Sequence, residues 1–259
     1  MTENPSAAAT SLCMATADRV EVRGRDLARD LMGNVTFTDY FYLLVTGSMP
    51  TNDQRFFLDV LLVAIAEHGL MPTVQAARMT LAADPNSLQG ALAAGILGAG
   101  PVLLGTAERC GELLTSAAAR IDARESDAAV VAAMTQDVRR TGGRMPGFGH
   151  PVHKPVDPRA ERILELAETR GIAGRHIRLA RLFHAAVANA WGKPLVMNVS
   201  MPIAATLLDL NFPPAAIKTV PLLARTASIL AHLVEEKARP IGFHMAAAAE
   251  KSVAFDGKT

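Results

Sequence analysis

The stretch Gly147–Arg159 reads GFGHPVHKPVDPR and concentrates more polar chemistry than any other segment of the chain. Its two glycines allow the backbone to approach a ligand closely. His150 can exchange a proton near neutral pH, and Arg159 carries a rigid fork that fits a carboxylate. Asp157 and Pro158 are typical of the first positions of a helix. We therefore predict a functional loop that leads directly into a helix.

On both sides of this loop the sequence has the periodicity of α-helices. In Gln54–Glu67, apolar residues recur three and four positions apart, and no convincing strand alternation occurs elsewhere. Aromatic residues make up only 5% of the chain, and alanine is abundant, which suits helix-on-helix packing. The alanine-rich ends Ala7–Thr10 and Ala246–Ala249 are predicted to lie outside regular structure. We predict an all-α protein with helices at Gln54–Glu67, Thr73–Ala83, Ser87–Leu97, Thr106–Ile121, Asp127–Thr141, Asp157–Arg170, Arg175–Asn189, Ile203–Leu210 and Pro214–Lys237.

Composition narrows the class of protein. A chain of 259 residues, half of them hydrophobic, fits one large domain or two closely joined ones. The net charge is +1 and like charges form no block, which argues against nucleic acid or membrane surfaces as partners. Met1–Pro5 lacks the pattern of a signal peptide, and no uncharged apolar run approaches the roughly 20 residues of a membrane span. With only Cys13 and Cys110, a reducing, cytoplasmic setting is expected.

Several motifs, in this order, resemble those of the citrate synthase superfamily, which includes the citryl-CoA lyases. The loop is similar to the family's GxGH…DPR signature, and VRGRDL at 22–27 and YLLVTGSMPT at 42–51 are similar to its entry segment. The resemblance implies an all-α fold of two helical domains with the site in the cleft between them. Residues 1–102 and 201–259 would form the large domain, and 103–200 the small one. The other matching motifs are EHG at 67–69, GPV at 100–102, NVS at 198–200, LART at 223–226 and RP at 239–240.

The resemblance also implies which side chains serve the site. Its substrates are coenzyme A thioesters, so an acyl-coenzyme A and a small carboxylate are the implied partners, with no metal and no tightly bound cofactor. Catalytic positions are implied for three residues: His150, Ser200 and His68. Carboxylate binding is implied for His68, Arg159, Arg225 and Arg239, and coenzyme A contacts for Gly147, Gly149, Lys154, Lys193 and Asn198.

Two positions depart from the family pattern. The family's enol-stabilising histidine is Leu103 here, and its proton-moving aspartate is Ser200. Leucine cannot donate a hydrogen bond, and serine has no useful basicity without an adjacent base. The loss of one oxyanion donor typically costs about 10²–10³ in rate, and the loss of a general base about 10²–10⁴. Ordinary condensation of acetyl-CoA with oxaloacetate is therefore expected to be badly impaired.

Three functions remain open at this point. The first is C–C bond cleavage or formation on the coenzyme A thioester of a polycarboxylic or related acid, with His150 as base on the substrate hydroxyl and His153 as a conceivable helper. The second is hydrolysis or decarboxylation in the same pocket. The third is a non-catalytic or regulatory homologue that binds coenzyme A or a carboxylate. Arg239 resembles an arginine that reaches the neighbouring subunit's site, so a homodimer is expected in each case.

Overall fold

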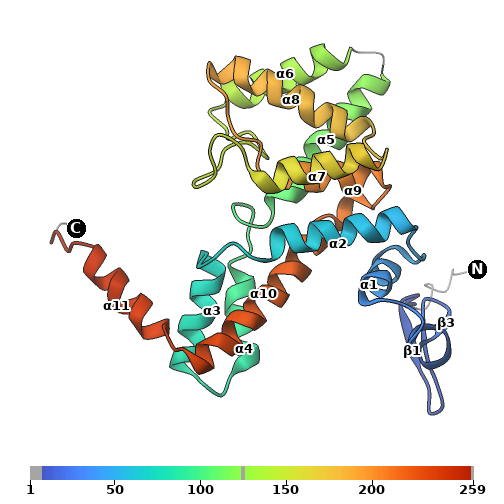
Figure 1. Ribbon diagram of the computed structural model, residues 1–259, viewed down its shortest axis with the longest axis vertical. Helices are drawn as coiled ribbons and strands as arrows, with labels where there is room; N and C mark the ends of the chain where they lie inside the picture. The colour runs from blue at the N-terminus through green and yellow to red at the C-terminus, as the bar shows by residue number, and fades with distance from the viewer. Residues whose placement is uncertain (1–7, 124–125, 258–259) are drawn as a thin grey trace, which may run out of the picture. The chain divides into compact units, whose positions relative to one another are not determined.

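The computed structural model describes residues 8–123 and 126–257 (Figure 1). The segment Met1–Pro5 and residue Ala7 lie outside the described residues. The predicted all-α class is confirmed, because eleven α-helices and only one small sheet occur in the part of the chain described. The chain divides into two compact units, the first ending at Asp59 and the second beginning at Val60.

The first unit contains elements that the sequence patterns did not predict. Its helix α1, Phe37–Thr46, begins with a capping box in which Thr36 and Asp39 exchange hydrogen bonds, and it ends at Gly47, whose φ is 80°. The sequence does not predict the small sheet, because strands of two or three residues are too short to show alternation of apolar and polar residues. It pairs β1 (Cys13–Ala15), β2 (Val20–Val22) and β3 (Arg25–Asp26) antiparallel, before a π-helix at Leu27–Leu31.

Helix α2 runs from the first unit into the second, and the remaining helices belong to the second unit. The predicted segments exist, with corrected ends: α9 begins at Ser200 rather than Ile203, and the predicted helix from Pro214 starts as a 3₁₀ turn. Residues 246–249 are part of helix α11, so the prediction that they lie outside regular structure is wrong. Alanine has the highest helix propensity, and an alanine-rich segment can form a helix without a clear apolar periodicity. The elements are α2 Asn52–Ala66, α3 Pro72–Ala83, α4 Leu88–Leu97, α5 Thr106–Asp122, α6 Asp127–Arg140, α7 Pro158–Thr169, α8 Arg175–Trp191, α9 Ser200–Asp209, α10 Thr219–Ala238 and α11 Gly242–Ser252.

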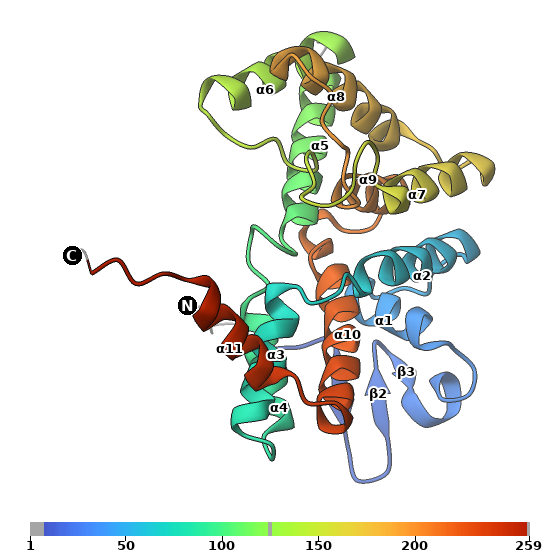
Figure 2. The same ribbon diagram turned by 60° about the vertical axis from the view of Figure 1, so that its left-hand side comes forward.

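Two groups of helices make up most of the second unit (Figure 2). In one, α10 packs against α3 and α4, and α11 packs against α3. In the other, α9 packs against α5, α7 and α8, and α6 against α8. The division into a large and a small helical domain stays a prediction. The core of the first group is apolar and fully enclosed, and consists of Val74, Ala77, Leu81, Ala91, Ile229 and Leu233.

One helical stretch is long and apolar enough to cross a membrane. Among the described residues, this is Pro214–Ala238, with 25 residues; its 18-residue apolar window has a mean hydropathy of 1.3, and 44% of that window is buried inside the protein. It also carries the buried polar side chains of Arg225, Ser228 and Glu236. A helix that packs against α3 and α4 and encloses a guanidinium and a carboxylate has the character of a core helix.

Candidate active site

Backbone pairing brings together two loops that are fifty residues apart in the sequence. Phe148 and Met197 form an antiparallel bridge. The N–H of Gly149 donates to the carbonyl of Val196 at 2.7 Å, and the N–H of Asn198 donates to that of Gly147 at 2.9 Å. The Asn198 side chain adds a hydrogen bond to the Gly149 carbonyl at 3.0 Å. This pairing fixes the histidine loop beside the first turn of α9.

The two loop glycines have different roles. Both have positive φ, 80° at Gly147 and 91° at Gly149, which glycine adopts without strain. A Cβ at Gly147 would lie 2.8 Å from both Cys110 Sγ and Met201 Cβ, whereas the space around Gly149 is open. Gly147 is thus required for packing, while Gly149 leaves room for a ligand.

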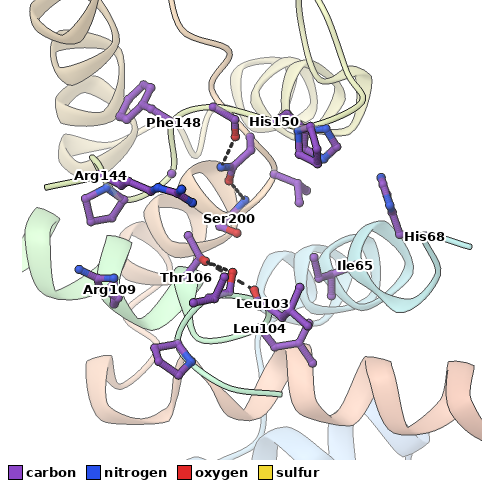
Figure 3. Close-up of a pocket in the computed structure, with 18 of the residues that line it drawn as sticks. Ile65, His68, Leu103, Leu104, Thr106, Arg109, Arg144, Phe148, His150 and Ser200 are labelled. Atoms are coloured by element: carbon purple, nitrogen blue, oxygen red, sulfur yellow. Dashed lines mark hydrogen bonds between the residues drawn. The ribbon is translucent and has the colours of Figure 1, made fainter. Parts of the chain in front are cut away.

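A pocket of about 670 Å³ lies against this loop. Its lining comes from the end of α2, the start of α5, the loop at 144–151, Arg159 on α7, the start of α9 and Arg225 on α10. Figure 3 shows His150 on the loop, with His68 and Ser200 presented by other elements around the same cavity. The structure therefore gathers His68, His150, Arg159, Arg225, Gly147, Gly149, Asn198 and Ser200 around one cavity.

Asp157 holds Arg159 in place. Its carboxylate accepts hydrogen bonds from Arg159 Nε at 3.0 Å and Nη2 at 2.8 Å, and also from the Val199 N–H at 3.1 Å. Burial raises the pKa of Asp157, but the hydrogen bonds and charge of Arg159 outweigh burial and hold it below its usual value. One buried carboxylate thus fixes both the arginine and the backbone that leads into α9.

Arg225 is a buried polar side chain of the site whose donors are only partly satisfied. It is only 4% exposed, and its Nε and Nη1 have no hydrogen-bond partner among the described residues. Nη2 alone donates, to the Ile65 carbonyl at 3.3 Å. Burial lowers the pKa of Arg225, and the charge of Arg159 lowers it further, against the opposing charge of Glu67. A buried guanidinium with open donors that lines a pocket is a strong site for an anion.

Three histidine rings pack together at one side of the pocket. The rings of His150 and His153 stack with centroids 4.3 Å apart, and His68 Nε2 lies 3.2 Å from His153 Nε2. Burial lowers the pKa of His68, as do the charges of Arg159 and His153. Burial and His153 likewise lower the pKa of His150. The lowered pKa values favour the neutral forms of His68 and His150.

The proton of His150 is placed by the backbone. Its Nδ1 accepts the N–H groups of Val152 at 3.1 Å and His153 at 2.8 Å, so the neutral ring carries its proton on Nε2. In this arrangement the ring donates a hydrogen bond and has no free lone pair for a substrate proton. The predicted role of His150 as the base is thus not the one that this geometry supports.

The same tautomer bears on metal binding. Ring nitrogens of His68, His150 and His153 lie within 4.8 Å of one another, a spacing that also suits a metal ion. Histidine binds a metal through a deprotonated nitrogen, but Nδ1 of His150 is already occupied and Nε2 carries the proton. Arg159 Nη2 lies 3.5 Å from that Nε2 and can only donate, so a hydrogen bond between them would need an unprotonated Nε2. The shorter backbone hydrogen bonds to Nδ1 favour the Nε2–H form instead, which leaves two donors side by side. The two donors fit an oxygen anion.

Another part of the pocket lining is apolar. Leu103 lines the pocket and Leu104 beside it is buried. In Figure 3 these two side chains and Ile65 gather on one side of the cavity. Helix α5 starts next to them with Gly105 at its N-cap, so no side chain caps the first N–H groups. Ser200 lines the pocket as the first residue of α9.

Some predicted residues lie elsewhere, and others were missed. Lys154 and Lys193 are exposed and do not line the pocket, so their coenzyme A contacts stay predictions. Arg239 is also exposed and outside it, and its backbone carbonyl accepts a hydrogen bond from Arg78 Nη2 at 3.1 Å. Arg109 and Arg144 do line the pocket. Arg144 stands three residues before the first loop glycine, a nearness that could have drawn attention to it.

A polar network supports the turn that carries His68. Glu67 accepts hydrogen bonds from Ser228 at 2.7 Å and from His232 at 2.9 Å, and also from the backbone of His68. Burial raises the pKa of Glu67, but these partners together hold it below its usual value. The network continues through His232 to Arg78, whose Nε pairs with the buried Glu236 at 2.6 Å.

Comparisons with solved structures give the same fold. The chain matches a citryl-CoA lyase from Hydrogenobacter thermophilus with a TM-score of 0.84 and 27% identity, over 97% of this chain and 95% of that one. An ATP citrate lyase from Methanothrix soehngenii, solved with citrate and coenzyme A, matches at 0.76 and 16% identity over 92% of this chain and 40% of that one. Citrate synthase from Thermotoga maritima matches with a TM-score of 0.65 and 21% identity, over 79% of this chain and 55% of that one. The last two show the fold alone.

No curated protein shows a significant sequence match to the chain. The family model described as citrate synthase, C-terminal domain, matches residues 53–242. This range contains every residue of the pocket and most of the chain. The family model and the structural match to a citryl-CoA lyase agree with the order of motifs around the histidine loop. The chain belongs to the citrate synthase family.

Proposed function

We propose that this protein cleaves or forms a C–C bond in the coenzyme A thioester of a hydroxylated polycarboxylic acid, as a citryl-CoA lyase-like enzyme. One observation carries the proposal: two donors of a buried guanidinium, Nε and Nη1 of Arg225, have no hydrogen-bond partner among the described residues, and this side chain lines the pocket. His150, whose Nε2 lies 3.5 Å from Arg159 Nη2, lines the same pocket. The 27% identity to a citryl-CoA lyase over nearly the whole chain supports the acyl-coenzyme A part.

The substrate carboxylates would lie on the cationic side of the pocket. Arg225 offers two open donors in a buried setting, where a charge-assisted, bidentate hydrogen bond is strongest. Arg159 is oriented by Asp157, and it faces the same oxygen position as His150 Nε2. His150 then donates to the hydroxyl or keto oxygen of the substrate, and its neutral form is favoured by its lowered pKa.

The enolate of the leaving thioester needs a donor that Leu103 cannot supply. Cleavage and condensation of one substrate pair share a transition state, so the missing donor affects both directions. The N-terminus of α5 is the replacement that the pocket offers, because its first N–H groups lack a side-chain cap and Thr106 lines the cavity. Backbone N–H groups at a helix N-terminus stabilise a developing oxyanion.

The coenzyme A part would extend along the loop at 144–151. Gly149 leaves open space for it, and Asn198 lines the pocket beside that glycine. Arg109 and Arg144 join Lys154 and Lys193 as candidates for the phosphates, since cations at an exposed rim suit them. The exposed position of Arg239 suits a contact with a second subunit, and we propose a homodimer in which it completes the neighbour's site.

A second reaction is favoured by the two substituted positions. Thioester hydrolysis and decarboxylation need no base that removes an α-proton, and Ser200 offers none. In either case the same arginines would hold the carboxylates. Binding without turnover is the third alternative, and it predicts tight coenzyme A binding with no product.

A panel of acyl-coenzyme A thioesters, analysed by mass spectrometry, separates these functions. Citryl-CoA and related hydroxyacyl thioesters should yield a keto acid and a shorter acyl-CoA, and this yield should fall strongly in His150→Ala. The exposed His244→Gln variant serves as the control for loss of a histidine. Free coenzyme A with an intact acid would instead indicate hydrolysis, and loss of CO₂ would indicate decarboxylation. No product from any thioester would refute an enzymatic function.

A further inference from the structure

The histidine cluster contains a proton acceptor that the substituted family positions lack. His150 is held as a donor, because its Nδ1 accepts two backbone N–H groups. His68 and His153 differ from it: their Nε2 atoms are 3.2 Å apart, and one of them must donate to the other. Whichever ring donates its Nε2 proton keeps an unprotonated Nδ1. This pair therefore offers a free lone pair, whereas His150 does not.

The two rings are arranged in series. His68 lines the pocket, whereas His153 does not, and the two rings contact each other with centroids 5.3 Å apart at 88°. We propose that His68 takes the proton of the substrate hydroxyl and passes its Nε2 proton to His153, while His150 acts only as a hydrogen-bond donor. This inference rests on the proposed function, since it needs a substrate that carries a hydroxyl group.

The step balances as a retro-aldol cleavage. The hydroxyl O–H bond breaks and an N–H bond forms at Nδ1 of His68, while the Nε2 proton moves to Nε2 of His153. The oxygen electron pair forms the carbonyl, the C–C bond breaks, and its pair enters the thioester enolate. The enolate carbon then takes a proton from water. His153 returns the Nε2 proton to His68, which releases its Nδ1 proton to the hydroxide left behind, so both rings regain their starting tautomers. No proton is gained or lost overall.

The surroundings of the pair suit a group that must start neutral. The charged and titratable groups that face His68 are Arg159, His153 and Asp157, with His150 packed at 5.3 Å. Arg159 disfavours a second positive charge, and the buried Asp157 partly offsets it once the proton arrives. A neutral imidazole next to a fixed anion is the usual arrangement for a base that works near pH 7.

Substitutions at His153 separate proton uptake from mere orientation. His153→Gln keeps an amide oxygen that can accept the hydrogen bond of His68 but cannot take up its proton, and His153→Phe keeps the ring packing alone. We expect kcat for hydroxyacyl-CoA cleavage to fall about tenfold or more in both, with KM within about threefold, because a general base contributes about 10²–10⁴. His244→Gln should match the parent. Full activity in His153→Gln would overturn the inference while leaving the proposed function intact.

Two further readouts do not depend on turnover. Nitrogen NMR of the parent protein should show the proton of His150 on Nε2, and loss of His153 should alter the titration of His68 but leave that tautomer unchanged. A proton on Nδ1 of His150 would overturn the inference. So would one equivalent of metal in the purified parent that is absent from His153→Gln, because the pair would then be a ligand set. A parent that cleaves no hydroxyacyl thioester would refute the proposed function itself.

Discussion

The wall of the pocket formed by His150, Arg159 and Arg225 differs sharply from the wall formed by Ile65, Leu103 and Leu104. The first contains two donors of Arg225 that no described residue satisfies, on a side chain that is only 4% exposed. The second offers only apolar surface and the uncapped start of α5. Burying a charge without hydrogen-bond partners destabilises a protein, so we interpret Arg225 as a residue that binds a ligand. The side chains of Ile65, Leu103 and Leu104, where the enolate would lie, include no buried charge. The comparison supports the proposal that the cationic wall binds an anion, while the apolar wall departs from the family pattern at Leu103.

Replacing Arg225 should give the largest effect on the cationic wall. We expect Arg225→Met to weaken binding of citrate or oxaloacetate about 100-fold or more, because each hydrogen bond to a charged group contributes about 1.5–3 kcal/mol. The unliganded variant should be more stable than the parent, since it no longer buries open donors. Calorimetric titration and thermal unfolding measure the two effects. Arg162→Met, at an exposed position of α7, is the control, and a less stable Arg225→Met would contradict this account of the site.

Asp157→Asn should disturb the same wall indirectly. It removes the charge that holds Arg159 and weakens the link to the Val199 N–H. Breaking a buried ion pair costs about 3–5 kcal/mol. Because Arg159 is partly exposed, we expect the free energy of unfolding to decrease by about 3 kcal/mol. Urea unfolding measures the loss, and saturating citrate should restore part of it by binding to the native state. An unchanged midpoint would show that Asp157 does not organise this wall.

The apolar wall can be tested by restoring the family pattern. Leu103→His with Ser200→Asp should raise the rate of condensation of acetyl-CoA with oxaloacetate well above that of the parent, because a donor and a base return to the enolate side. Free coenzyme A release and citrate formation report the reaction, and the single variants serve as controls. Brisk citrate formation by the unmodified protein would show that Leu103 and Ser200 do not limit the chemistry.

Lowering the pH should modestly decrease the free energy of unfolding, through the two histidines that line the pocket. The pKa values of His68 and His150 are lowered in the folded protein, chiefly by burial, from an ordinary value of 6.5. The unfolded chain then binds more protons, so stability is complete above pH 6.5 and decreases as the pH falls below it. Unfolding midpoints between pH 7.5 and 5.5 should show this slope, and it should be shallower in His68→Gln. A slope of opposite sign would mean that the cluster favours protonation.

The phosphate side should give the smallest effects. Lys154→Ala and Lys193→Ala remove exposed cations outside the pocket, whereas Arg144→Ala removes one that lines it. We expect Arg144→Ala to weaken coenzyme A binding about fivefold to tenfold, and each lysine variant by less, as exposed ion pairs contribute under about 1 kcal/mol. Carboxylate binding should stay unchanged in all three. A larger loss of coenzyme A affinity in the lysine variants than in Arg144→Ala would indicate that Lys154 and Lys193 are the main phosphate contacts.

The fold class and most helices were predictable, because long amphipathic segments such as α2 and α5 leave a clear 3.6-residue period. Short strands and α1 were not, since β3 has two residues and α1 is marked chiefly by its capping box. Motif order predicted that His150, Arg159 and Arg225 belong together, and the pocket gathers them. It did not predict the tautomer of His150, which depends on backbone N–H groups that only the folded loop places.

The most direct test of the account is the identity of the products formed from citryl-CoA by the unmodified protein. Purified enzyme would be incubated with citryl-CoA, quenched over time and analysed by mass spectrometry, with Arg225→Met as the binding-deficient control. The account predicts acetyl-CoA and oxaloacetate in equal amounts, at a rate that falls to background in the control. Citrate and free coenzyme A as the products, or no conversion despite bound coenzyme A, would contradict it.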